Sequence, residues 1–244
     1  MRPARFFVDP PLETGARIEL PERAAHHAAR VLRLRAGDPL TLFDGRGGEY
    51  AGTIANLAGD SLTVEIHAWQ DIERESPLAV TLAQGISSAE RMDYTVQKAV
   101  ELGVARIQPL VAQKSVVRLD ARRAESRLAH WRRIAISACE QCGRNRLPEV
   151  HAPISVAELC EATRRAPARW LLAPEAQTRL RDAAHELGER LVMAAGPEAG
   201  FSDAETRALL AAGFARVNLG PRILRTETAA LAAIAALNAI AGDG

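Results

Sequence analysis

The sequence predicts a small β-barrel followed by an α/β domain whose sheet is mainly parallel. Three observations support this fold class. Short strands with alternating apolar residues occupy residues 5–68, and one helix interrupts them. A charged stretch that ends in proline, residues 69–77, is typical of a linker. From Leu78 onward, apolar strands alternate with amphipathic helices, as in a parallel sheet covered on both faces.

The first part contains five expected strands, at residues 5–8, 17–20, 39–43, 49–57 and 62–68. The glycine-rich stretch 44–48 predicts a hairpin between the third and fourth strands. One helix is expected over residues 22–34, because Pro21 precedes it and apolar residues follow at helical spacing. Strands this short, with a single helix, favour a small barrel.

The second part alternates five expected strands, 78–84, 106–111, 170–173, 191–195 and 216–219, with helices at 91–102, 122–142, 156–165, 180–187, 203–211 and 226–240. In open α/β sheets, ligands bind beyond the carboxyl ends of the strands. Two of these strands end in Gly-Pro, at Gly196 and at Gly220. We therefore place the candidate site at these two turns.

Composition sets broad limits on the protein class. A length of 244 residues with 48% hydrophobic residues is sufficient for packed cores. The apolar run near the N-terminus is interrupted at Asp9-Pro10-Pro11, which does not fit a secretory signal, and the apolar segment 228–241 is shorter than the roughly 20 residues that span a bilayer. We therefore expect a cytoplasmic protein without a membrane anchor. Three cysteines indicate free thiols.

Positive charge is clustered although the net charge is only +1. Residues 23–35 contain four arginines with His26 and His27 and no acid, and residues 114–146, including Arg118, contain nine Lys/Arg against three acids. Such clusters are typical of phosphate recognition. The alternative is a solvated helix face in an arginine-rich sequence.

The two glycine-proline turns have a shape that suits a small ligand. The first, residues 196–202, enters a helix that Ser202 or Asp203 can cap, and the second, residues 218–228, enters a helix that we expect Thr226 to cap. Glycine lets a ligand approach the backbone, whose free amides can bind an adenine edge or a ribose. Neither turn is a phosphate-binding loop or a dinucleotide fingerprint, so ATP and NAD are not indicated. The alternative is two tight turns without function.

The turns Gly196-Pro197-Glu198-Ala199-Gly200-Phe201-Ser202 and Leu219-Gly220-Pro221-Arg222-Ile223-Leu224-Arg225-Thr226-Glu227-Thr228-Ala229 resemble the cofactor signature of the RsmE family. These are 16S ribosomal RNA uridine-N3 methyltransferases of the SPOUT superfamily. Further matching segments are Arg5-Phe6-Phe7, 27–33 with Gly37-Asp38, 42–45, 98–104, 107–109 and 140–145 with Pro148. The resemblance covers nearly the whole chain; Ala199 departs from it, because the family usually has glycine there.

The resemblance implies a PUA-like RNA-binding β-barrel domain at residues 1–72 and a SPOUT domain at 73–244 whose last segment forms a trefoil knot. It also implies S-adenosylmethionine as the cofactor, a homodimer that completes the site, and 16S ribosomal RNA or the small ribosomal subunit as the partner. Two alternatives stay open: a SPOUT methyltransferase acting on another RNA, and a non-catalytic RNA-binding protein of ribosome assembly.

The residues that match the family motif are the expected cofactor contacts: Leu172, Gly196, Gly200, Leu219, Gly220, Ile223, Leu224, Arg225, Thr226 and Ala229. Leu172 rests on its strand position more than on a motif. Uridine N3 carries a proton at neutral pH, so a base must remove it or a cation must stabilise the resulting charge. Arg225 is the candidate cation and Glu198 and Glu227 are candidate bases, although a carboxylate at a helix N-terminus can also be purely structural.

The remaining assignments concern RNA and metals. Asn145, with Arg144, is expected to orient the target base, and the expected RNA contacts are Arg5, Arg30, Arg33, Arg132, Arg133 and Arg144. Cys139 and Cys142 have the spacing of a redox pair or half a zinc site, but no second half accompanies them, so no metal is expected. Trp131 and Trp170 lie in apolar patterns and are expected in the core.

Overall fold

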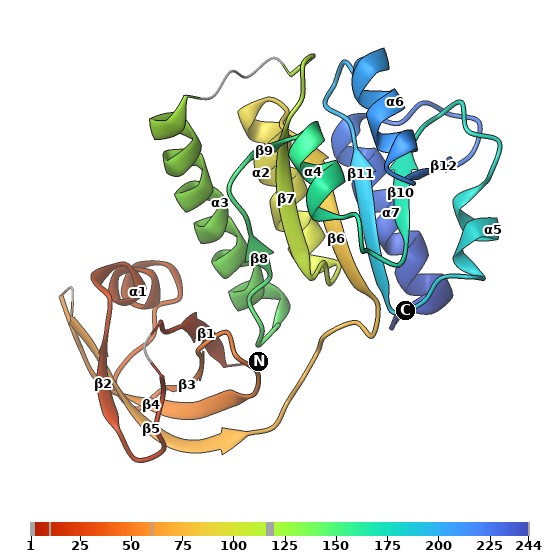
Figure 1. Ribbon diagram of the computed structural model, residues 1–244. Coiled ribbons are helices and arrows are strands. Elements are labelled where there is room, and N and C mark those ends of the chain that lie inside the picture. Colours follow the sequence, from red (N-terminus) through yellow and green to blue (C-terminus); the bar gives the residue numbers. More distant parts are fainter. Residues whose placement is uncertain (1–2, 10, 60, 116–119, 244) are drawn as a thin grey trace. The chain divides into compact units, whose positions relative to one another are not determined.

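The computed structural model describes residues 3–9, 11–59, 61–115 and 120–243, and it divides into two compact units (Figure 1). The first unit comprises the chain up to Glu75 together with residues 139–147, and the second comprises residues 76–138 and 148–243. Pro10 and Arg118, which entered the expectations above, lie outside the described residues.

The first unit is built on a five-stranded sheet of order β1-β3-β4-β5-β2. Its strands are β1 (Ala4–Phe7), β2 (Arg17–Leu20), β3 (Pro39–Phe43), β4 (Glu49–Ala58) and β5 (Ser61–Gln70). β1 runs parallel to β3, and the other neighbours are antiparallel. Inward-facing apolar side chains such as Phe6, Leu42 and Val64 form its core. The five expected strands are confirmed, with ends displaced by at most two residues.

The helix of this unit differs from the expected 22–34. The α-helix α1 (Glu22–His26) continues as a π-helix, η1 (His27–Val31). The N–H of Leu32 donates to the carbonyl of His27, a bond that spans five residues and widens the turn. Arg33 then takes a φ of 56°, which no helix can continue. Hydrophobic spacing alone does not distinguish such a widened turn from an α-helix.

Residues 139–147 are fixed within the first unit by polar contacts. Helix α3 (Ala121–Cys142) ends at Gly143, whose φ of +93° favours glycine. The Glu140 carboxylate accepts the N–H of Phe7 at 3.1 Å, and the Arg144 guanidinium pairs with Glu75. A segment that the sequence assigned to the second domain therefore packs as part of the first unit.

The second unit contains a seven-stranded sheet in which every pair of neighbours is parallel. Its order is β12 (Ala215–Val217), β10 (Arg169–Leu172), β11 (Arg190–Ala195), β6 (Ala79–Gly85), β7 (Arg106–Val111) and β8 (Glu149–Val150), with β9 (Ile154–Ser155) also paired to β7. This confirms the expected α/β class. β8 and β9 were not expected, because two residues are too few to show a strand pattern.

Helices cover both faces of this sheet, as the alternation predicted. The helices besides α3 are α2 (Ala89–Glu101), α4 (Val156–Ala162), α5 (Leu180–Ala184), α6 (Asp203–Ala211) and α7 (Thr226–Ala241). α2 packs against α7 and α4 against α6, and the two pairs lie on opposite faces in Figure 1. Trp131 and Trp170 are buried, as expected. Within the described ranges, no helix has the length and hydropathy to cross a bilayer.

Candidate functional site

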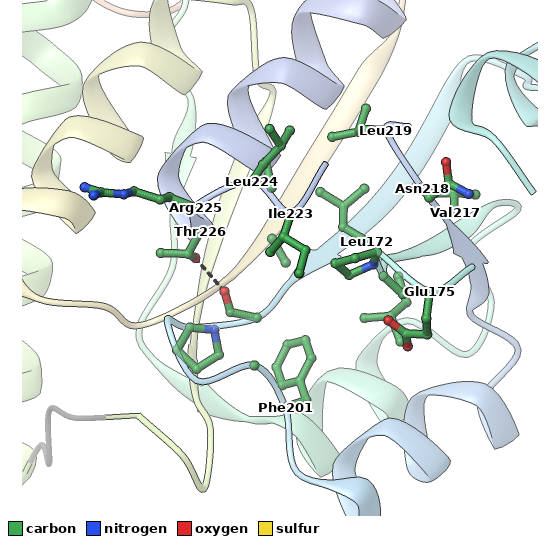
Figure 2. Close-up of a pocket in the computed structure, with 18 of the residues that line it drawn as sticks. Leu172, Glu175, Phe201, Val217, Asn218, Leu219, Ile223, Leu224, Arg225 and Thr226 are labelled. Carbon is green, nitrogen blue, oxygen red and sulfur yellow. Dashed lines mark hydrogen bonds between the residues drawn. The ribbon is translucent and has the colours of Figure 1, made fainter. Parts of the chain in front are cut away.

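A cavity of about 560 Å³ lies at the carboxyl ends of β10, β11 and β12, within the second unit (Figure 2). Most of its lining residues lie within the segments 171–175, 195–201 and 217–229, at and just after the ends of these three strands, and Arg91 from α2 completes the wall. Because neighbouring parallel strands end at the same edge of the sheet, their turns converge there. The volume lies in the range of small-molecule sites.

All the expected cofactor contacts line this cavity: Leu172, Gly196, Gly200, Leu219, Gly220, Ile223, Leu224, Arg225, Thr226 and Ala229. Leu172, expected more from its strand position than from a motif, is the last residue of β10. Lining residues that sequence reasoning missed include Arg91, Glu175, Phe201 and Asn218. Glu175 and Asn218 could have been found as polar residues just after strand ends. Arg91 could not, because only the tertiary structure brings α2 to these turns.

The two turns are joined by Thr226. Its hydroxyl donates a hydrogen bond to the carbonyl of Gly196 at 2.5 Å and accepts one from the amide of Gln84 at 2.9 Å (Figure 2). Thr226 was expected to cap α7, and this is wrong. Arg225 occupies the N-cap position, and no side chain caps the helix there. The Thr226 hydroxyl bonds the other turn instead, because the carbonyl of Gly196 lies at hydrogen-bond distance from it.

Two glycines at or beside the first turn are required by the backbone, one by close packing and one by its conformation. A Cβ at Gly85, the last residue of β6, would lie 2.4 Å from Cδ of Pro197, so only glycine admits the first turn at this distance. Gly200 has a φ of +68°, which also favours glycine. Arg33 is the only described non-glycine residue with positive φ, so Ala199 has an ordinary backbone conformation. The departure from the family pattern at Ala199 is therefore tolerated.

The exit of the first turn is fixed by the start of α6. The Ser202 hydroxyl accepts the N–H of Glu205, and the Glu205 carboxylate accepts the N–H of Ser202, which forms a capping box. This confirms Ser202 as the cap. The other carboxylate oxygen of Glu205 accepts the N–H of Gln113 at 2.8 Å, which ties the segment after β7 to the same turn.

Glu198 lies at the cavity as an ionised group. Its Oε1 accepts the N–H of Ser88 at 2.9 Å and a hydrogen bond from Nη1 of Arg91 at 3.2 Å. Burial acts to raise the pKa of Glu198, but these donors outweigh burial and the pKa lies below its ordinary value. Glu227 is outside the cavity lining, and its Oε1 lies 3.9 Å from Nε of Arg91. The environment of Glu198 therefore does not favour a carboxylate that accepts a proton near neutral pH.

Asn145 belongs to the first unit, where its amide is fully used. Its Oδ1 accepts from Nη2 of Arg5 at 2.5 Å, its Nδ2 donates to the carbonyl of Ile72 at 2.6 Å, and the residue is completely buried. These bonds indicate a structural role for Asn145 inside the first unit, and its expected role toward a base stays a prediction. Arg225, in contrast, lines the cavity, and Figure 2 shows its side chain directed away from Phe201 and Glu175.

The expected RNA contacts separate into buried and exposed groups. Arg5 pairs with Glu49 at 2.6 Å and lies over the ring of Phe43, and the Arg144 side chain is only 4% exposed. Direct phosphate contact requires an accessible guanidinium, so these partners favour structural roles for Arg5 and Arg144 inside the first unit over the expected RNA contacts. The exposed group consists of Arg30, Arg33, Arg132 and Arg133.

Cys139 is a buried thiol at the end of α3. Burial raises the pKa of the Cys139 thiol to about 12, which keeps it protonated and unreactive. The described residues contain no group of three or more His, Cys, Asp or Glu side chains arranged to hold a metal ion.

Comparison with known families matches both units. A model described as an RNA methyltransferase PUA domain matches residues 20–66, and one described as an RNA methyltransferase domain matches residues 74–238. The fold, the cavity and these matches define the class as RNA methyltransferases that carry a PUA domain.

Individual relatives narrow this class. The ribosomal RNA small subunit methyltransferase E of Buchnera aphidicola (subspecies Schizaphis graminum) is 33% identical over 98% of this chain and 97% of its own length. The protein of that name from Neisseria gonorrhoeae, solved with S-adenosyl methionine, is 40% identical with a TM-score of 0.89 over 99% of both chains. A Legionella pneumophila structure with bound cofactor SAM is 37% identical with a TM-score of 0.95 over 100% of both chains. The chain belongs to the ribosomal RNA small subunit methyltransferase E family.

Proposed function

We propose that this protein transfers the methyl group of S-adenosylmethionine to N3 of a uridine in the 16S RNA of the small ribosomal subunit. The observation that carries the proposal is the cavity at the strand ends, whose walls include all the cofactor contacts expected from the sequence. The relatives from Neisseria gonorrhoeae and Legionella pneumophila, both solved with this cofactor, support it.

The residues present fit S-adenosylmethionine. Leu172, Leu219 and Leu224 supply apolar walls suited to a purine ring. A Cβ added at Gly200 or Gly220 would meet nothing within 4 Å, so at both positions the turn backbone borders open space. A ligand can therefore reach the backbone amides that a side chain would cover. The apolar walls and the accessible backbone amides can together bind an adenosine, and no phosphate-binding loop is needed.

The chemistry needed from the chain is limited, because the sulfonium methyl is already activated. The protein must align the uridine N3 with that methyl at about 3–3.5 Å and manage the N3 proton. The lowered pKa of Glu198 makes it a weak base. We therefore favour charge stabilisation over proton abstraction by a carboxylate, with Arg225 at the cavity as one cation.

The organisation proposed around this site follows the family. Residues 1–72 would act as a PUA-like RNA-binding domain and residues 73–244 as the SPOUT methyltransferase domain. The trefoil knot and the homodimer stay predictions of the family resemblance. Because the proposed substrate is ribosomal RNA, the proposed location is the cytoplasm.

Two measurements test the proposal. Calorimetry with the purified chain should show binding of S-adenosylmethionine and S-adenosylhomocysteine; a folded protein that binds neither would support a non-catalytic RNA-binding role. Mass spectrometry of nucleosides from 16S RNA should show loss of 3-methyluridine in a deletion strain and its return with a plasmid copy. Retention of 3-methyluridine, with loss of another methylated nucleoside, would assign the enzyme to a different RNA position.

A further inference from the structure

Arg91 is a cation at the cavity that neither signature turn contains. It lies in the first turn of α2, which follows β6, and its side chain lines the cavity and is 40% exposed. Arginine stays protonated at any physiological pH, so it can supply charge and hydrogen-bond donors but cannot act as a base.

Two carboxylates from two different turns hold this guanidinium. Oε1 of Glu198, from the turn after β11, lies 3.2 Å from Nη1, and Oε1 of Glu227, from the start of α7, lies 3.9 Å from Nε. The side chains of Glu198 and Glu227 are 21% and 14% exposed. The N–H of Ser88, which precedes α2, anchors Glu198 in turn. The guanidinium is therefore positioned jointly by α2 and both signature turns.

The guanidinium has donors left for a ligand. It has five N–H groups in a planar fork. In the described part of the chain, Nη1 bonds Glu198 and Nε faces Glu227, and Nη2 has no hydrogen-bond partner. Since Arg91 borders the cavity, the remaining N–H groups can meet an oxygen atom of a bound molecule there.

We propose that Arg91 is a catalytic residue that donates hydrogen bonds to a carbonyl oxygen of the target uracil, with Glu198 and Glu227 as positioning residues. This inference rests on the proposed function. When N3 loses its proton to water, negative charge spreads onto the flanking carbonyl oxygens, where a fixed cation stabilises it. The N3 electron pair then forms the bond to the methyl carbon and the carbon–sulfur bond breaks, leaving neutral S-adenosylhomocysteine and a proton in solvent. The two glutamates therefore act through Arg91, by holding its guanidinium in place.

The test uses the full-length chain and small subunits isolated from a deletion strain. Single-turnover methylation by Arg91→Gln, Arg91→Lys and Glu227→Gln is measured from neutral to alkaline pH, with calorimetry for S-adenosylmethionine. Arg207→Gln, an exposed arginine on α6 outside the cavity lining, is the matched control. We expect Arg91→Gln to bind the cofactor within about twofold of wild type and to lose roughly 10²–10³-fold in rate at neutral pH, the range seen when one stabilising donor is removed.

The pH profile separates a catalytic role from a structural one. Without Arg91, the N3 proton is harder to lose, so the rate of Arg91→Gln should recover as pH rises, and its profile should shift to alkaline pH. Arg91→Lys keeps the charge and should keep the wild-type profile at a reduced rate. Glu227→Gln should lower the rate less than Arg91→Gln does.

Three results would overturn the inference. An unchanged methylation rate for Arg91→Gln would exclude a catalytic role. A raised KM for the small subunit with an unshifted pH profile would indicate that Arg91 contacts an RNA phosphate. Loss of cofactor binding would indicate that Arg91 acts in the cofactor pocket. If Arg91→Gln does not fold, a shifted pH profile for Arg91→Lys overturns it. Failure of the wild-type chain to bind cofactor or methylate would instead refute the proposed function itself.

Discussion

The hydroxyl of Thr226 donates a hydrogen bond to the carbonyl oxygen of Gly196 at 2.5 Å, across 30 residues of sequence. This bond joins the turn after β11 to the start of α7, the two segments that form most of the cavity wall. Gln84, completely buried on β6, donates to the same hydroxyl. A polar link between the two turns therefore helps to set the shape of the cavity.

Replacing Thr226 by valine should weaken both the fold and cofactor binding. Valine has the same shape but no hydroxyl, so the Gly196 carbonyl and the Gln84 amide lose their partner, at a cost of about 1–3 kcal/mol in the free energy of unfolding. We expect S-adenosylmethionine affinity to fall roughly tenfold, or about 1.4 kcal/mol. Denaturant unfolding and calorimetry measure the two effects. Thr226→Ser keeps the hydroxyl and should retain both; equal losses in both variants would contradict the assigned bond.

Replacing Gly85 by alanine should destabilise the second unit through steric overlap. The new Cβ would lie 2.4 Å from Cδ of Pro197, so β6 or the first turn must shift, at roughly 1–3 kcal/mol. Gly188→Ala is the control, because its Cβ would meet nothing within 4 Å and the position is exposed. It should change the free energy of unfolding by no more than about 0.5 kcal/mol. Equal stability of the two variants would show that Gly85 is not needed for this packing.

Two carboxylates of the first unit, Glu49 and Glu140, should give opposite dependences of stability on pH. Burial alone raises the pKa of Glu49, but hydrogen bonds from Arg74 and Arg5 outweigh burial, and the pKa lies below its ordinary 4.5. Glu49 therefore stabilises the fold above pH 4.5, and this contribution disappears as the pH falls and the carboxylate is protonated in the folded state.

Burial raises the pKa of Glu140 above 4.5, although the N–H of Phe7 opposes this. Its contribution is therefore complete below pH 4.5 and is lost as the pH rises through the raised value. Denaturant titrations at stepped pH should show the difference between wild type and Glu49→Gln growing with pH, and that between wild type and Glu140→Gln shrinking. Parallel curves for the two variants would contradict these environments.

Removing charge at Arg30 and at Arg5 should affect different properties. Arg30 is exposed on η1, so Arg30→Gln should lower RNA affinity and reduce the slope of log affinity against log salt by about one, without changing stability. Arg5→Gln breaks the buried pair with Glu49 and should lower stability more than salt-dependent binding. Filter binding across a salt series and thermal unfolding measure the two effects. An unchanged salt slope for Arg30→Gln would remove this surface from the RNA interface.

The sequence predicted most of the secondary structure, because long apolar patterns and punctuating glycines are local signals. It failed where geometry depends on distant partners. The π-helix at His27–Val31 keeps helical spacing while its hydrogen bonds change, and β8 is too short for any pattern. Residues 139–147 read as the end of a helix and a loop, and only their contacts with Glu75 and Phe7 make them part of the first unit.

By itself the sequence determined the fold class and the two glycine-proline turns of the cavity wall, because such turns are continuous segments that carry their own glycines. The tertiary structure decided how side chains from separate segments are used. The Thr226 hydroxyl links the two turns and does not cap α7. Asn145 and Arg5 bond each other inside the first unit, and Arg91 pairs with Glu198 and Glu227. Residue type and spacing do not encode these pairings, because each depends on distances set by the packed sheet and helices.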